Sequence, residues 1–183
     1  MLIKEAQREL RSAFLGGFVG QFVAGVIWAL SAAVSTWASP TLGMATLFFV
    51  SMFLFPATQL VLRIMRRPAK LSPENTLNQL ATQIAFTVPI GFIVVGAATL
   101  YRQNWFYPAS MVIVGAHYLP FIFLYGMREF GILAGILVFG GVALGLYGPD
   151  LFILGGWLSA AVFISFAFVG RNVVQKEELK QAQ

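Results

Sequence analysis

The sequence has 183 residues, of which 58% are hydrophobic and only 10% are charged, and its formal net charge is +5 at pH 7. Soluble domains are about 45–50% apolar and about 25% charged, so this composition excludes an ordinary soluble domain and indicates an integral membrane protein. The chain contains no cysteine, which excludes disulfides, thiolate metal sites and cysteine nucleophiles.

Residues 2–12, with the sequence LIKEAQRELRS, are predicted to form an amphipathic helix that lies in the membrane interface ahead of the first span. The apolar residues of this helix share one face: Leu2, Ile3, Ala6 and Leu10. The apolar run that follows, residues 13–38, is longer than the hydrophobic region of a signal peptide, which has about 7–15 residues. We therefore expect this run to be retained as the first membrane span.

Six hydrophobic segments follow, each long enough to cross the ~30 Å hydrocarbon core of a bilayer as a helix. They are residues 13–37, 42–65, 80–101, 106–127, 130–148 and 151–170. The sequence thus predicts an all-α, polytopic membrane protein, with six transmembrane helices in one bundle and a single integral membrane domain over residues 1–183.

The basic residues are distributed unevenly between the two ends of the predicted spans. Eleven of the twelve fall in the termini and in the links after the second and fourth spans, and Arg102 alone lies on the other side. By the positive-inside rule both termini are expected to be cytoplasmic, as an even number of spans requires. We therefore expect Ala69 to be cytoplasmic and Asn104 external. The same rule explains the positive net charge, so no nucleic-acid partner is predicted.

Aromatic residues mark the external ends of the predicted spans. They are Trp37, Tyr101, Trp105 and Tyr107. Their position is typical of the interfacial aromatic belt of a membrane protein, in which the rings lie at headgroup level.

Small residues recur four positions apart in the first, fifth and sixth spans. The pairs are Gly16 with Gly20, Gly131 with Gly135, Gly141 with Gly145, Gly155 with Ser159, and Gly156 with Ala160. Such faces let helix backbones approach closely in lipid. Two interpretations remain open: packing within one bundle, and a homo-oligomer that forms through the glycine-rich fifth and sixth spans.

Three predicted spans contain an internal proline: Pro56, Pro89 and Pro120. Each proline lacks a backbone donor and frees the carbonyl four residues earlier. In lipid, the freed carbonyls need partners or a water-filled cavity. We therefore expect the second, third and fourth spans to share a central cavity.

Polar side chains are expected to face the interior of the bundle, and most of them occur in the same three spans. The candidate ligand-binding residues are Gln59 and Arg63 in the second span, Gln83 and Thr87 in the third, His117 and Tyr118 in the fourth, and Gln21 in the first. Two roles remain open for this set. Its members either hold the helices together by hydrogen bonds or form a site for ligand binding or conduction.

His117 is the only histidine and lies about halfway along its span, among apolar and aromatic residues. A neutral imidazole there offers one hydrogen-bond donor and one acceptor. We expect it to bond to a polar side chain of a neighbouring span or to the Ala116 carbonyl that Pro120 frees. One histidine without cysteine or a nearby acid does not make a usual metal ligand set, so neither a metal nor another cofactor is predicted.

The stretch FYPASMVIVGAHYLPFIFLYGM, residues 106–127, carries a resemblance. Together with the length and the six spans, it resembles a family of small bacterial membrane proteins classed as a domain of unknown function. The residues that carry the resemblance are Pro108, Ser110, Gly115, His117, Tyr118 and Pro120. The resemblance implies a bacterial inner membrane and brings no established activity.

No catalytic motif or pair of acids near the membrane is present in the sequence, and we therefore expect no enzyme. One interpretation is an inner-membrane transporter or channel-like protein for a small polar or anionic solute, with a polar site among spans two to four. Arg63 and Arg66 would lie at the cytoplasmic mouth of that site. The alternative is a non-catalytic interaction or sensor protein that docks on a partner through its helices.

Overall fold

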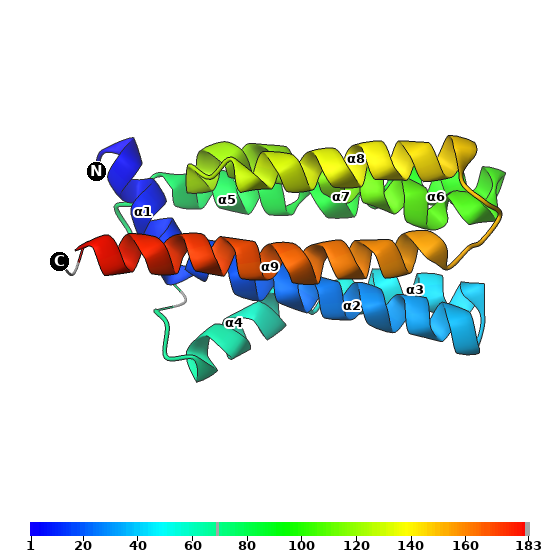
Figure 1. The fold of residues 1–183 in the computed structure, drawn as a ribbon, viewed down its shortest axis with the longest axis horizontal. Coiled ribbons are helices and arrows are strands. Elements are labelled where there is room, and N and C mark those ends of the chain that lie inside the picture. The colour runs from blue at the N-terminus through cyan, green and yellow to red at the C-terminus, as the bar shows by residue number, and fades with distance from the viewer. Residues whose placement is uncertain (69, 182–183) are drawn as a thin grey trace.

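The computed structural model describes residues 1–68 and 70–181, so Ala69 and residues 182–183 of the predicted domain lie outside the described residues. Within the described residues the chain is helical and contains no β-strand, which confirms the all-α class (Figure 1). The elements are α1 (Ile3–Ala13), η1 (Leu15–Gly17), α2 (Phe18–Trp37), α3 (Pro40–Ser51), α4 (Leu54–Ile64), α5 (Leu77–Ala85), α6 (Thr87–Tyr101), η2 (Gln103–Trp105), α7 (Phe106–Tyr125), α8 (Glu129–Tyr147) and α9 (Leu154–Gln181).

Five helical stretches have the length and apolar composition of membrane spans. They are Leu15–Trp37, Leu77–Tyr101, Gln103–Tyr125, Glu129–Tyr147 and Leu154–Lys180. The second predicted span is instead divided into α3 and α4, which meet at an angle of 57°. The described residues therefore provide five spans, or six if this bent pair crosses the membrane as one broken span.

The bend between α3 and α4 has a local cause in Pro56, the third residue of α4. Proline has no N–H to donate to the carbonyl of Met52, so the helical ladder is interrupted there. The amide of Phe53 bonds to the carbonyl of Val50 at 3.0 Å, and regular helical bonding resumes only with Ala57. The helix that follows is therefore free to take a new direction.

The expectation of a central cavity shared by three prolines is wrong. Pro56 and Pro89 are exposed on the outside of α4 and α6, and Pro120 is half-buried within α7. Pro56 and Pro89 each occupy the third position of their helix. At that position the N–H would have no partner within the helix in any case, so these two prolines need no water-filled cavity to compensate them.

Four long helices form the centre of the bundle. α7 packs along α8 and α2 packs along α9 (Figure 1), and the two pairs meet through contacts of α9 with α7 and α8. Aromatic rings fill the space between them: the centroid of Phe163 on α9 lies 5.9 Å from Trp28 and 5.8 Å from Tyr118. All three side chains are buried.

The remaining helices are attached to the outside of this centre. α3 and α4 pack on α2, whereas α5 and α6 pack on α7. The span Leu77–Tyr101, which contains α5 and α6, is the least buried of the five: 11% of its most apolar stretch is buried, against 28–44% in the others. This span therefore has the weakest hold on the rest of the bundle.

Glycines of α8 and α9 are used for packing inside the bundle. A Cβ on Gly141 would lie 2.6 Å from the carbonyl oxygen of Pro108 on α7, and one on Gly155 would lie 2.8 Å from the Cβ of Tyr107. Gly135 differs, because a Cβ there would meet only Phe139 of its own helix, at 4.0 Å. These contacts favour the interpretation of packing within one bundle.

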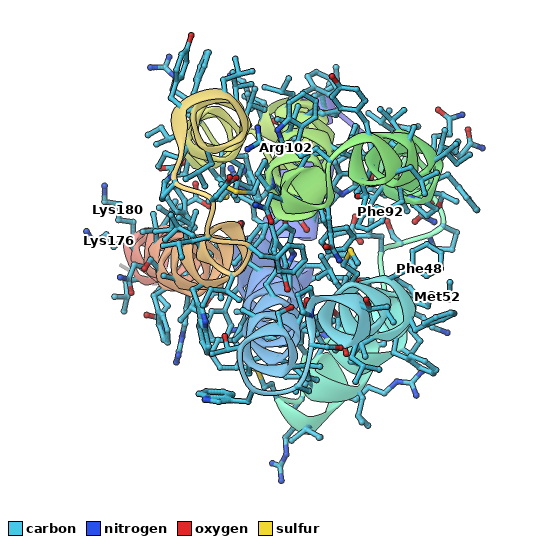
Figure 2. The ribbon with its side chains drawn as sticks, turned by 90° about the vertical axis from the view of Figure 1, so that its right-hand side faces the viewer. Phe48, Met52, Phe92, Arg102, Lys176 and Lys180 are labelled. Atoms are coloured by element: carbon cyan, nitrogen blue, oxygen red, sulfur yellow. The ribbon has the colours of Figure 1, made fainter. Side chains whose placement is uncertain are left out.

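Both termini lie at the same end of the bundle, which we call the terminal end (Figure 1). The opposite end holds Arg102, and Figure 2 views the bundle from that side. Arg102 forms an ion pair with Asp150, with Nη2 and Oδ1 2.6 Å apart. Charge is therefore balanced locally at the opposite end, and the excess of basic residues lies at the terminal end.

The sequence predicted that the whole apolar face of α1 lies in the membrane interface. In the structure only part of this face is free to do so. Ala6 and Leu10 are buried, each with an exposed fraction of 1%, whereas Leu2 and Ile3 remain exposed. The buried part of the face packs on the terminal end of the bundle. At this end of the bundle, α1 contacts α7.

Candidate functional site

The site around His117 is set by the helical geometry of α7. Gly115 faces α8, since a Cβ there would lie 2.8 Å from Val138 Cγ2. Two residues further along α7, the side-chain direction has turned by about 200° around the helix axis, and His117 therefore faces α6. Tyr118 points into the interior, where its ring stacks on Phe130 at 6.0 Å. The two adjacent residues therefore serve different faces of α7.

His117 hydrogen-bonds to Thr87 at the start of α6, with Nδ1 and Oγ1 2.9 Å apart. The Thr87 hydroxyl also donates to the carbonyl of Ile84 at 2.7 Å. A hydroxyl has a single hydrogen, so Thr87 donates to the carbonyl and accepts from Nδ1–H. This network assigns the neutral imidazole to the Nδ1–H tautomer, and Nε2 is then the acceptor.

The surroundings of the imidazole are aromatic and apolar. Its centroid lies 5.0 Å from the ring of Phe121 and 5.5 Å from that of Tyr118. No carboxylate among the described residues hydrogen-bonds to His117, and the described chain holds no group of three or more His, Asp or Glu placed to bind a metal. The chemistry available is therefore that of one oriented imidazole beside one hydroxyl.

The other predicted site residues are dispersed. Gln83 lies on α5, one helical turn before Thr87, and is exposed. Gln59 is half-buried and Arg63 exposed on α4, a helix that packs on α2. The structure thus brings Thr87 and His117 together, with Tyr118 beside them on another face of α7, and it leaves the two α4 residues on a different part of the bundle.

Gln21 also lies apart from His117. It is buried in α2, and its Oε1 has no hydrogen-bond partner among the described residues. It borders a gap too narrow to admit a water molecule, which is otherwise lined by Gly16, Met127, Glu129, Phe130, Phe166 and Gly170. Gln21 therefore belongs to the contact between α2, α8 and α9.

A buried cluster of hydroxyls was missed by the sequence analysis. Tyr107 hydrogen-bonds through its hydroxyl to Ser31 at 2.7 Å and to Ser35 at 2.9 Å, and Ser31 also donates to the carbonyl of Gly43 at 2.8 Å. The expectation that Tyr107 joins an aromatic belt is wrong, because its exposed fraction is 0%. Tyr107 lies eleven residues, or about three helical turns, before Tyr118, which the sequence already placed in the interior, and this spacing would have predicted an interior position.

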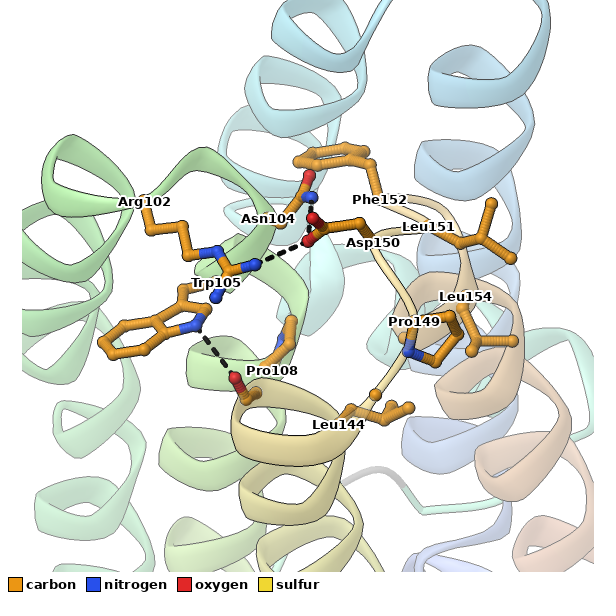
Figure 3. Close-up of a pocket in the computed structure, with 13 residues that line it drawn as sticks. Arg102, Asn104, Trp105, Pro108, Leu144, Pro149, Asp150, Leu151, Phe152 and Leu154 are labelled. Atoms are coloured by element: carbon orange, nitrogen blue, oxygen red, sulfur yellow. Dashed lines mark hydrogen bonds and ion pairs between the residues drawn. The ribbon is translucent and has the colours of Figure 1, made fainter.

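A small depression lies at the opposite end of the bundle, between the link before α7 and the link before α9 (Figure 3). Asn104 and Arg102 donate to Asp150 at 2.9 and 2.6 Å, and these two hydrogen bonds keep the pKa of Asp150 below its usual value. The free volume of about 20 Å³ is enough for a single water molecule. The depression thus joins two links and has no room for a solute.

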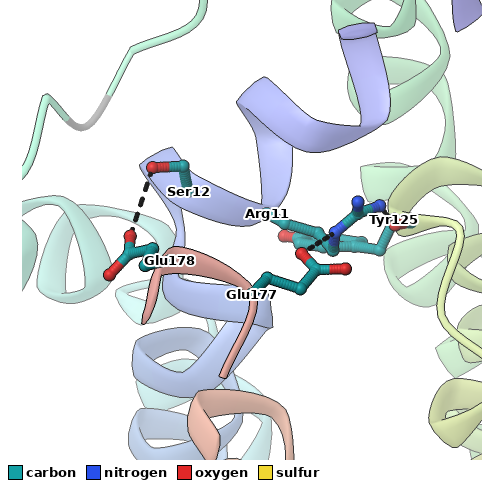
Figure 4. A network of polar contacts seen from close by, with 5 residues as sticks. All are labelled: Arg11, Ser12, Tyr125, Glu177 and Glu178. Carbon is teal, nitrogen blue, oxygen red and sulfur yellow. Dashed lines mark hydrogen bonds and ion pairs between the residues drawn. The ribbon is translucent and has the colours of Figure 1, made fainter. Parts of the chain in front are cut away.

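A polar network fastens α1 to the terminal end (Figure 4). Arg11 forms an ion pair with Glu177 of α9 at 2.9 Å and donates to the carbonyl of Tyr125 at 2.6 Å. Ser12 contacts Glu178 at 3.5 Å, and Glu178 also pairs with Arg67 at 3.1 Å. One short helix is thereby connected to α7, to α9 and to the segment after α4.

Glu9 of α1 holds the segment before α5. Its carboxylate accepts from the Ser72 amide at 2.6 Å and from Asn75 Nδ2 at 2.8 Å. The bond from the Ser72 backbone is the main reason that the pKa of Glu9 lies below its usual value. Because folding lowers this pKa, the contact is fully formed above the ordinary glutamate pKa of about 4.3 and is lost as the pH falls through the lower pKa of the folded protein.

We therefore expect the Ser72 amide to lose protection from hydrogen exchange when the pH is lowered from neutral to well below the ordinary glutamate pKa of about 4.3. Protection factors for Ser72, corrected for intrinsic exchange, measure this loss. In the Glu9→Gln control the contact is weaker near neutral pH and no longer changes as the pH is lowered. If the Ser72 amide of the unmodified protein were equally protected near neutral pH and at low pH, the prediction would be contradicted.

The described residues combine long apolar helices with a mostly filled interior, an architecture consistent with a multi-pass helical membrane protein. Residues 3–172 match the family described as "Family of unknown function (DUF7010)", and the chain belongs to this family. The resemblance to a family of unknown function is thus confirmed. No curated protein and no solved structure matches the chain.

Proposed function

We propose that this protein is a small transporter of the bacterial inner membrane with its solute site at the His117–Thr87 pair. The observation that supports this is the 2.9 Å hydrogen bond between Nδ1 and Oγ1. It connects α7, which contributes to the centre of the bundle, to the least buried of the five spans. A polar pair at such a junction is the place where a moving span would take up or release a solute.

In this proposal, the span Leu77–Tyr101 is the moving element and α7 is the fixed one. Separation of Thr87 from His117 would free one donor and one acceptor for a polar solute, and the return of the span would expel it. Arg63 and Arg66 are exposed on and just after α4. They would attract anions to the terminal end, whereas the pair itself suits any solute with hydrogen-bonding groups.

The test is flux into liposomes that contain the purified protein, with chloride, inorganic phosphate and glycerol as the probes. We expect His117→Ala to abolish flux of the transported probe and Thr87→Val to reduce it about tenfold, since one hydrogen bond is lost. Gln59→Ala, on the distant α4, is the matched control and should retain flux. Flux that is no greater than in protein-free liposomes for all three probes would refute the proposal.

A docking role is the second candidate, and the exposed apolar side chains of α4 favour it. Only Thr58 and Leu62 of this helix are buried, while Phe55, Leu60 and Ile64 are exposed. A partner helix would cover this side. A membrane protein that co-purifies with the unmodified chain and is lost in Leu60→Ser would support docking, and purification of the chain alone in mild detergent would oppose it.

We also propose that both termini are cytoplasmic, which the excess of basic residues at the terminal end supports. The absence of cysteine makes labelling with an impermeant thiol reagent specific. Lys70→Cys replaces the neighbouring Ala69 as a reporter for the terminal end, and the exposed Gln103→Cys avoids the Asn104 contact with Asp150. On intact cells we expect Gln103→Cys to be labelled and Lys70→Cys to be spared. The reverse pattern would invert the orientation.

A further inference from the structure

The unused acceptor of His117 defines what kind of ligand the site takes. Thr87 fixes Nδ1–H, so Nε2 carries a lone pair. Nε2 has no hydrogen-bond partner among the described residues, and it is not one of their buried unpartnered atoms, which are Gln21 Oε1, Thr58 Oγ1 and Ser159 Oγ. An accessible acceptor in apolar surroundings calls for a donor, because an unmatched polar group in a membrane is costly.

Charge around the site argues against an anionic head. The flanking groups are the rings of Phe121 and Tyr118, and no Lys or Arg lies within α5, α6 or α7. A carboxylate or phosphate brought to Nε2 would face a lone pair and no cation. A neutral hydroxyl or N–H group would instead complete the hydrogen bonding of the imidazole.

The α6 side of the site is open to the surroundings of the bundle and is apolar. Thr87 is itself exposed, and so are Phe86 beside it and Ile90 about one turn further along α6. By contrast, the contact between α3 and α6 is closed by Phe48 and Phe92, whose ring centroids are 6.0 Å apart (Figure 2). The approach along α6 is therefore lined by apolar side chains, as suits a molecule that arrives from the bilayer.

We infer that the His117 site takes an amphiphile with a neutral hydrogen-bond donor as its head and an apolar body, which reaches the site from the bilayer along the exposed face of α6. This inference goes beyond the proposed function: it uses the same His117–Thr87 pair but does not require transport. It concerns another class of ligand, since a charged or fully hydrophilic solute has no apolar body to lie against the exposed side chains of α6.

The single histidine makes a direct test available. Protein labelled only with ¹⁵N-histidine and placed in lipid nanodiscs reports His117 alone. We expect the spectrum to show a protonated Nδ1 and an unprotonated Nε2. Dodecanol should move the Nε2 signal upfield, while dodecyl methyl ether, which has the same chain and no donor, should bind about tenfold more weakly and leave the signal unchanged. Dodecanoate should also leave it unchanged near neutral pH.

Thr87→Val removes the partner that fixes the tautomer, and we expect it to produce a mixture of Nδ1–H and Nε2–H signals and to abolish the preference for the alcohol over the ether. Thr99→Val is the matched control on α6, because the Thr99 hydroxyl donates only to the carbonyl of Val95 in its own helix. This control should behave like the unmodified protein.

An Nε2–H tautomer in the unmodified protein would overturn the inference, as would an equal response to the alcohol, the ether and the carboxylate. So would the absence of any response to saturating dodecanol. Flux of chloride, phosphate or glycerol that depends on His117 without a response to dodecanol would leave the proposed transport standing and refute the ligand class. A selective dodecanol response without flux would support the ligand class and refute the proposed transport.

Discussion

Gly141→Leu is expected to destabilise the protein by about 3 kcal/mol and to lower its thermal unfolding midpoint in detergent by about 6–12 °C. The physical reason is the close approach of α8 to α7. A Cβ on Gly141 would lie 2.6 Å from the Pro108 carbonyl oxygen and 3.0 Å from Met111 Cβ. Backbone and Cβ atoms cannot rotate away as the end of a flexible side chain does, so the two helices would have to separate.

Gly135→Leu is the matched control, since it adds the same side chain to the same helix. Gly135 has open space beside it, and we expect no change in the midpoint. We propose a homo-oligomer through α8 only at this open face. Such a homo-oligomer predicts that Gly135→Leu changes the oligomeric mass and leaves the stability unaltered. Equal loss of stability in both variants would contradict the packing described for α7 and α8.

Tyr107→Ala is expected to cost about 3–5 kcal/mol, the usual range for deleting a buried aromatic ring. The ring is fully buried, and its centroid lies 5.1 Å from that of Phe152 and 6.0 Å from that of Trp28. Tyr107→Phe keeps the ring and removes the hydroxyl that Ser31 and Ser35 share. This second variant should cost about 1–3 kcal/mol. Unfolding midpoints in one detergent measure both effects.

Tyr101→Ala provides the comparison, because Tyr101 is 82% exposed at the same end of the bundle. We expect a small effect there, limited to its contact with the Trp105 ring at 5.6 Å. If Tyr101→Ala and Tyr107→Ala were equally destabilising, the buried hydroxyl cluster would not be a feature of the folded protein.

The sequence was sufficient to predict the helical class and most of the spans, because long apolar runs between charged links have few structural solutions in a membrane. It did not predict the bend within the second span. Residues 42–65 are apolar enough to be one span, but Pro56 interrupts the ladder of backbone hydrogen bonds, and a hydropathy profile does not detect a missing N–H. The separation of this segment into α3 and α4 depends on a hydrogen bond that the chain cannot make.

The candidate site was predicted in part. His117 and Thr87 meet as expected, because polar groups in apolar spans must find partners and those two spans are neighbours in sequence and in space. Gln59 and Arg63 do not join them, since the direction of α4 depends on the bend before it. The Ser31–Ser35–Tyr107 cluster was overlooked because serine in a membrane helix serves equally as a small packing residue and as a hydrogen-bond donor.

The attachment of α1 has a consequence for how the chain is made. Arg11 leaves the ribosome 166 residues before its partner Glu177. Domains generally fold during synthesis from the N-terminal side, yet this helix cannot complete its contacts until α9 has been synthesised. The spans before α9 would therefore be inserted while α1 is still unattached, and the Arg11–Glu177 pair would form only once α9 has been synthesised. α1 is thus synthesised before these spans and takes its final place after them.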